Sequence, residues 1–97
     1  MKVTVSTVPF EEQDGSPTQM VVLAAKGVSE EDSYHMRQKF LDAADAMMGI
    51  LDMEVILFIS GANMRLTMRF PEDGWEEEDM LDAVYQNVPT ELADYFD

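Results

Sequence analysis

The chain has 97 residues, of which 46% are hydrophobic and 9% aromatic, so it fits a single domain spanning residues 1–97 and is too apolar for an intrinsically disordered protein. It contains no cysteine, which excludes disulfides, thiolate zinc sites and a cysteine nucleophile. Twenty acidic residues against six basic ones give a net charge of −14, which disfavours direct binding to DNA, RNA or an anionic membrane and favours cations or basic protein surfaces as partners.

The first two predicted elements form a β-hairpin. β-Branched residues occupy every second position from Val3 to Thr7, which is typical of a half-buried strand, and we expect Pro9 to end it. Residues 11–17 are rich in turn-forming types. The apolar run within residues 18–26 predicts the second strand.

A long amphipathic helix follows. Ser29 begins it, with Asp32 three residues later in the manner of a capping box. Apolar side chains then recur at the spacing of one helix face: Met36, Phe40, Ala44, Met47 and Leu51. We expect Gly49 to end this helix, and His35 to lie on its polar face.

A second hairpin is predicted next. Residues 53–59 are apolar on both faces, which is typical of a central strand, and Ser60–Asn63 predicts a tight turn. The following strand alternates apolar residues with outward-facing Arg65 and Arg69, which can pair with an acid on a neighbouring strand such as Glu54.

Two helices complete the chain. Asp73 or Gly74 is expected to cap the first, whose opening turn Glu76–Asp79 complements the positive end of the helix dipole. Pro89 ends it, and residues 90–96 predict a short final helix.

The predicted order of elements is β-β-α-β-β-α-α. Short hairpin connections and segregated helices favour an α+β fold, a single domain with a four-stranded antiparallel sheet and helices packed on one face. The strand order stays open. The fourth strand or its neighbour is expected to leave a sheet edge for pairing, which allows a homodimer as well as a monomer.

The chain contains neither a predicted membrane span nor a predicted secretory signal. Its apolar runs, such as Val55–Ile59, are far below the roughly 20 residues of a membrane helix, and the N-terminus has no basic region followed by an apolar stretch. We therefore expect a cytoplasmic protein.

The residues offer little support for catalysis. His35 has no second imidazole or thiol with which to build a site, which indicates a solvated side chain. No phosphate-binding glycine loop and no nucleophile elbow occurs. Setting Gly15 or Gly74 at the sixth position of a calcium loop places Phe10 or Arg69 where a carboxylate is needed. We expect no enzymatic activity, no cofactor and no metal site.

The acidic residues are concentrated near the C-terminus. Residues 72–97 hold 10 of the 20 acids and neither Lys nor Arg. Acids three or four residues apart on a helix lie about 5 to 6 Å from one another, and each such pair destabilises the helix by a few tenths of a kcal/mol. The candidate binding surface consists of Glu76, Glu78, Asp79 and Asp82 on the second predicted helix, with Glu31, Asp42 and Asp45 on the first.

Rows of unneutralised carboxylates approximate a nucleic-acid backbone, which carries a charge about every 3.4 Å along each strand. In size, charge, lack of cysteine and acid-only helices such as Glu76–Asp79 with Asp82, the chain resembles the small acidic DNA-mimic inhibitors of phages and mobile elements, the anti-CRISPR and anti-restriction proteins. The resemblance is compositional and includes no shared motif. It implies stoichiometric binding to the basic nucleic-acid channel of a host defence nuclease or CRISPR surveillance complex.

Two other functions stay open: an immunity- or antitoxin-type inhibitor of a basic nuclease, and a generic acidic adaptor subunit. In the mimic hypothesis the partner's Lys and Arg bind the candidate carboxylates. Trp75 and Tyr85, beside the acids, are the candidate apolar anchors. For Trp75 the competing interpretation is a cap that packs onto the sheet.

Overall fold

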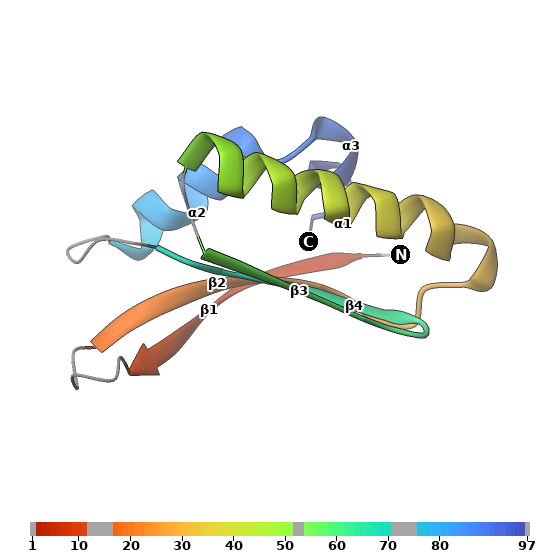
Figure 1. Ribbon diagram of the computed structural model, residues 1–97, viewed down its shortest axis with the longest axis horizontal. Helices are drawn as coiled ribbons and strands as arrows, with labels where there is room; N and C mark the ends of the chain where they lie inside the picture. Colours follow the sequence, from red (N-terminus) through yellow and green to blue (C-terminus); the bar gives the residue numbers. More distant parts are fainter. Residues whose placement is uncertain (1, 12–16, 52–53, 71–75, 97) are drawn as a thin grey trace.

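A four-stranded antiparallel sheet forms one layer of the protein (Figure 1). The computed structural model describes residues 2–11, 17–51, 54–70 and 76–96. The strands stand in the order β1 (Val3–Glu11), β2 (Pro17–Ala25), β4 (Asn63–Arg69) and β3 (Glu54–Ser60), and each pairs antiparallel with its neighbour. Both predicted hairpins, β1–β2 and β3–β4, are confirmed.

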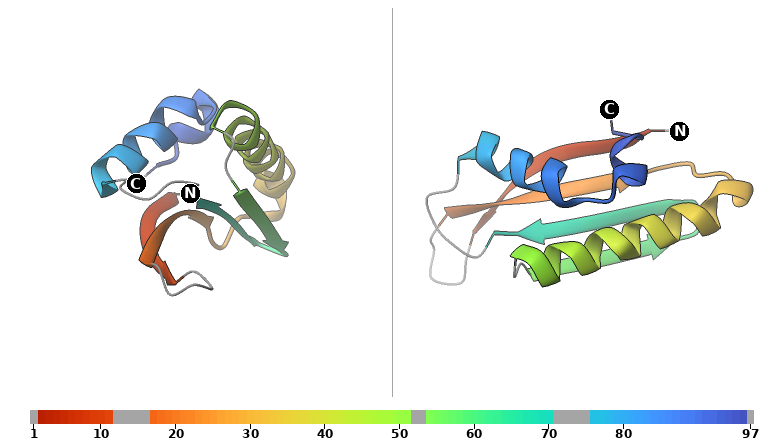
Figure 2. Two further views of the ribbon diagram at one scale, coloured as in Figure 1. Left: turned by 60° about the vertical axis from the view of Figure 1, so that its left-hand side comes forward. Right: turned by 90° about the horizontal axis from the view of Figure 1, so that it is seen from above.

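Three helices form a second layer on one face of the sheet (Figures 1 and 2). α1 (Glu30–Leu51) contacts β3 and β4, α2 (Glu77–Asn87) contacts β2, and α1 also contacts α2 and α3 (Thr90–Ala93). The C-terminal end of α1 and the N-terminal end of α2 lie at the same end of the long axis. The predicted single α+β domain, with the order β-β-α-β-β-α-α, is confirmed.

The inward faces of the two layers enclose one apolar core. The largest fully buried side chains include Phe40, Leu23, Met36, Met47, Met64, Leu66, Met68, Met80 and Leu92. Methionine is unbranched and fills irregular space between sheet and helices, which accounts for its frequency here. No polar or charged side chain is buried among the described residues, so their charges are all displayed at the surface.

β1 extends further than the sequence predicts. Pro9 does not end the strand, which continues to Glu11, and Pro9 lies opposite Gln19 of β2. β1 is at the edge of the sheet, and at Pro9 it pairs with β2 alone. A proline, which lacks an N–H, is tolerated in such a strand.

β3 lies at the other edge of the sheet, so the prediction of a central position was wrong. It pairs with β4 alone, and its outward side chains Ile56 and Phe58 are 70% and 51% exposed. A strand with apolar residues on both faces resembles a central strand in sequence. Here the helices cover only one face of the sheet, and the apolar residues on the other face of β3 are exposed. β2 and β4 are the two inner strands, and the expected open edge belongs to β3, the neighbour of β4.

α1 begins where its capping residues predict and ends later than expected. The Asp32 N–H donates a hydrogen bond of 3.2 Å to Ser29 Oγ, and the Ser29 hydroxyl donates one of 2.9 Å to Asp32 Oδ2. Gly49 does not end the helix, which continues to Leu51. Glycine favours a helix end where the chain takes a left-handed conformation, and among the described residues the glycines with positive φ are Gly27 and Gly61.

The C-terminal segment rejoins the sheet. α2 begins one residue later than predicted, after Glu76, and ends before Pro89 as expected; Asp73 and Gly74, its predicted caps, lie outside the described residues. The final helix covers only Thr90–Ala93. It is shorter than predicted because the Val3 N–H donates a 2.7 Å hydrogen bond to the Tyr95 carbonyl, and Phe96 forms a parallel bridge with Val3.

Candidate functional site

Every carboxylate whose side chain the structure describes is exposed, and all but one lie on the helical side. Glu54, on the outward face of β3, is the exception. The acidic helix layer, as we name it, consists of Glu30, Glu31, Asp32, Asp42, Asp45, Glu76, Glu77, Glu78, Asp79, Asp82, Glu91 and Asp94. The first turns of α1 and α2 each hold three of these acids, at the positive end of the helix dipole.

Within the part of the chain that the structure describes, basic side chains do not neutralise this layer. Among the described residues, Arg69 pairs with Glu54 on the sheet, and no Lys or Arg forms an ion pair with the acidic helix layer. The helices carry two basic side chains, Arg37 and Lys39. Lys39 lies over the ring of Tyr95, with its Nζ 6.0 Å from the ring centroid. The negative charge of the layer is therefore available to a partner.

α2 presents acids and an aromatic ring on one solvent-facing stripe. Glu78, Asp82 and Tyr85 follow one another at spacings of four and three residues, which aligns them along the helix, and all three are exposed. Tyr85 is 44% exposed. Its ring packs edge to face against Phe96, with the centroids 5.3 Å apart. The structure thus places the predicted anchor Tyr85 beside two of the predicted acids.

The other acids of α2 flank this stripe. Glu76 is the N-cap residue, and its side chain makes no capping hydrogen bond. Asp79 is exposed three residues before Asp82. Glu77, which was not among the predicted site residues, accepts a hydrogen bond of 3.2 Å from the Thr7 hydroxyl and is thereby held toward β1.

The α1 candidates divide into two groups. Asp42 and Asp45 lie in the C-terminal half of the helix, toward the end of the molecule where α2 begins (Figure 2). Gln38 Nε2 donates a hydrogen bond of 3.0 Å to Asp42 Oδ1, which orients that carboxylate. At a rise of 1.5 Å per residue, Glu31 lies about 16 Å from Asp42 along the helix axis. The fold therefore separates Glu31 from the acids of α2.

An apolar flank of α1 was missed by sequence reasoning. Tyr34, Leu41 and Met48 are 75%, 41% and 46% exposed and lie seven residues apart. Seven residues make almost two turns, so these side chains share one side of the helix. The spacing is present in the sequence but is masked by the stronger pattern of the buried face. Trp75, the other predicted anchor, lies outside the described residues.

The remaining sequence candidates add no reactive group to this surface. His35 is exposed, as its place on the polar face predicted, and its ring meets that of Tyr34 at a centroid distance of 5.8 Å. Within residues 2–11, 17–51, 54–70 and 76–96, no three His, Asp or Glu side chains are grouped so as to hold a metal ion. None of the helices in these ranges combines the length and the apolar character of a membrane span.

Comparisons with protein-family models, curated proteins and solved structures find no match for this chain. We therefore infer its function from its own charge and geometry.

Proposed function

We propose that this protein inhibits a host defence nuclease or CRISPR surveillance complex by occupying its basic nucleic-acid channel in place of DNA. The supporting observation is the acidic helix layer, whose twelve carboxylates are exposed on one side of the molecule without an ion pair to Lys or Arg among the described residues. Like charges so arranged repel one another and lower the stability of the fold. Binding to basic side chains of a partner relieves this repulsion.

The density of charge on α2 is comparable with that of a nucleic-acid strand. Residues 76–82 carry five carboxylates over about 9 Å of helix axis. A DNA strand carries about three phosphates over the same length. Lys and Arg form charge-assisted hydrogen bonds with carboxylates as they do with phosphates. A channel that tracks phosphates therefore has suitable ligands on α2.

Durable binding requires apolar contact in addition to charge. Tyr85 supplies it in this proposal, since its ring is exposed beside Glu78 and Asp82 and is fixed by Phe96. The carboxylates accelerate association and make it sensitive to salt. The protein then acts as a stoichiometric inhibitor in the cytoplasm, without turnover and without a cofactor.

An immunity- or antitoxin-type inhibitor of a basic nuclease is the second candidate, favoured by the apolar flank of α1. Tyr34, Leu41 and Met48 offer a surface suited to a packed protein interface. Such an inhibitor binds one nuclease with a modest salt dependence. A DNA mimic competes with DNA and loses affinity steeply as salt rises. A generic acidic adaptor neither competes with DNA nor changes nuclease activity.

The test is capture of partners from host lysate on the immobilised chain, followed by elution with a short DNA duplex. The wild type is compared with a variant carrying Glu78→Gln, Asp79→Asn and Asp82→Asn. A control carrying Glu30→Gln, Glu91→Gln and Asp94→Asn changes the net charge equally within the same layer.

We expect the wild type and the control to retain a nucleic-acid-binding protein that the duplex releases, and the α2 variant to lose it. The purified captured protein should lose nuclease or DNA-binding activity when the chain is added. Equal capture by the α2 variant, or capture that DNA does not reverse, contradicts the proposal.

A further inference from the structure

The sheet face opposite the helices is basic, whereas the helical side is acidic. Within the described ranges no helix covers this face (Figures 1 and 2). Four of the six basic residues of the chain lie on the strands or directly beside them: Lys2, Lys26, Arg65 and Arg69. In a chain of net charge −14, this separation places most of the positive charge away from the acidic helix layer.

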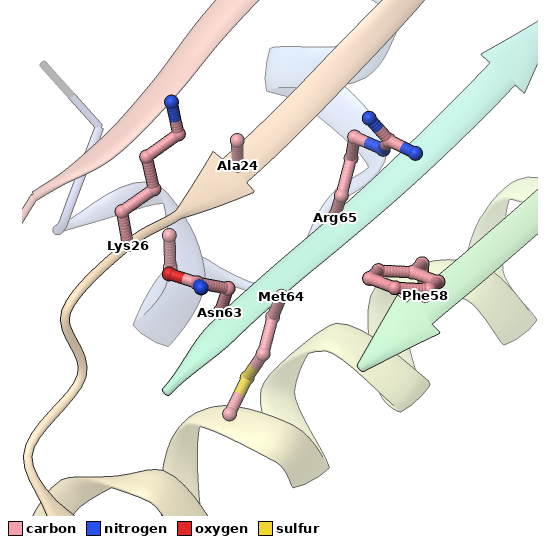
Figure 3. Close-up of a pocket in the computed structure, with 7 residues that line it drawn as sticks. Ala24, Lys26, Phe58, Asn63, Met64 and Arg65 are labelled. Atoms are coloured by element: carbon pink, nitrogen blue, oxygen red, sulfur yellow. The ribbon is translucent and has the colours of Figure 1, made fainter. Parts of the chain in front are cut away.

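A hollow of about 400 Å³ opens where β2 ends beside the β3–β4 turn (Figure 3). In the strand register Ala24 of β2 and Phe58 of β3 both lie opposite Arg65 of β4. Lys26 follows β2, and Asn63 begins β4. Ala24 lies between Lys26 and Arg65 in Figure 3. Because its side chain is only a methyl group, it leaves the space between these two longer side chains open.

The two cations at the hollow have no carboxylate partner in the described part of the chain. Among the described residues neither Lys26 nor Arg65 forms an ion pair, whereas Arg69 on the same strand is paired with Glu54. Arg65 instead lies over the ring of Phe58, with its Cζ 5.6 Å from the ring centroid. This cation–π contact orients the guanidinium and leaves its N–H groups for an acceptor.

The polar side chains of the hollow are hydrogen-bond donors. The Gly27 N–H donates a hydrogen bond of 3.3 Å to Asn63 Oδ1, so the free part of the Asn63 amide is its NH₂ group. With the Lys26 ammonium and the Arg65 guanidinium, this makes three donor groups. No carboxylate is among the described residues that line the hollow. Such a set of donors fits an anion.

We propose that this hollow binds a phosphate monoester attached to a planar ring, the chemistry of a mononucleotide. Arg65 binds two phosphate oxygens through its planar fork, and Lys26 and Asn63 donate to the phosphate as well. The ligand ring packs on the exposed part of Phe58. The volume lies within the range of small-molecule sites, about 300 to 1,000 Å³.

The negative charge of the helices does not prevent anion binding here. The molecule is 24 × 22 Å in cross-section, while the Debye length at physiological ionic strength is about 8 Å. Glu54 is the described carboxylate on the outward sheet face, and it pairs with Arg69. Arg69 lies four residues beyond Arg65, about 13 Å along the strand.

The experiment is an NMR titration of the full chain with AMP, and separately with adenosine and with inorganic phosphate. We expect saturable shifts with AMP at the amides of Lys26, Phe58 and Arg65, and weaker binding of adenosine and of phosphate. Arg65→Gln and Lys26→Gln should each weaken AMP binding by about tenfold or more. Arg69→Gln is the control, because it changes the charge of the same face equally and should bind AMP as the wild type does.

Three results would overturn the proposal: no saturable shift with AMP, phosphate alone binding as tightly as AMP, or Arg65→Gln binding as tightly as the wild type. The same spectra show whether each variant is folded. If Arg65→Gln does not fold, Lys26→Gln tests the site in its place. The inhibitor proposal is independent of these outcomes, since its carboxylates lie on the opposite side of the sheet.

Discussion

The ring of Tyr85 meets the ring of Phe96 edge to face, with the centroids 5.3 Å apart and the planes at 67°. Phe96 is in turn bridged to Val3 of β1. The C-terminal segment thus supports an exposed tyrosine beside Glu78 and Asp82. A side chain held in this way loses little conformational freedom on binding, which suits an interface anchor.

Tyr85→Ala should weaken binding to the captured partner by about tenfold or more, the loss typical of an anchor. The free energy of unfolding should fall by only about 1 kcal/mol, because the ring is 44% exposed and loses one aromatic contact. Titration calorimetry and urea unfolding measure the two quantities. Tyr34→Ala on α1 is the control, and a loss of affinity there instead of at Tyr85 would favour the immunity-type inhibitor.

Asp82→Lys should raise stability and lower function. The substitution replaces the repulsion between Glu78 and Asp82 with an attractive glutamate–lysine pair at a spacing of four residues. This change stabilises α2 by about 0.5 kcal/mol. It also removes a carboxylate from the proposed interface, so partner binding should weaken. Asp94→Lys on α3 makes the same change in charge and should leave binding intact. Thermal unfolding and partner capture check both effects, and a variant that loses stability and binding together would count against a binding role for Asp82.

Added NaCl should stabilise the protein at low ionic strength. The acids of α2 repel one another without basic residues among them, and salt screens this repulsion. We expect the free energy of unfolding to rise with salt, and to rise less in the variant with Glu78→Gln, Asp79→Asn and Asp82→Asn. Urea unfolding at several NaCl concentrations tests this. An identical salt response in both proteins would mean that these acids do not repel one another appreciably.

Two glycines should respond oppositely to alanine. Gly49 lies within α1, and a Cβ built there meets no atom within 4 Å, so Gly49→Ala should stabilise by about 0.5 to 1 kcal/mol. Gly61 has φ +55° in the β3–β4 turn, and Gly61→Ala should cost about 1 to 2 kcal/mol. Urea unfolding of both variants measures the difference. Destabilisation by Gly49→Ala would argue against a helix that continues to Leu51.

Local patterns predict the elements of this fold better than their arrangement. The spacing of Met36, Phe40 and Met47 identifies the buried face of α1, because helical periodicity is a property of neighbouring residues. The position of β3 in the sheet depends on which face the helices cover. Ile56 and Phe58 are apolar and exposed, so the strand resembles a central one in sequence and lies at the edge in the structure.

The acidic site on α2 and the hollow at Arg65 also differ in how far the sequence predicts them. The acids of α2 are neighbours in sequence, and their spacing alone places Glu78 and Asp82 on one side of a helix. The hollow at Arg65 is assembled from three strands, and only the pairing of β2, β4 and β3 brings Lys26 and Phe58 to it. Sequence reasoning had no strand order and could not find it.

The most direct test of the inhibitor proposal is whether DNA and this chain compete for the same captured protein. We expect the apparent Kd of the chain for that protein to rise in proportion to added duplex DNA, and its affinity to fall steeply between about 50 and 200 mM salt. A complex that forms equally well in saturating DNA would show that the acidic helix layer does not take the place of a nucleic acid.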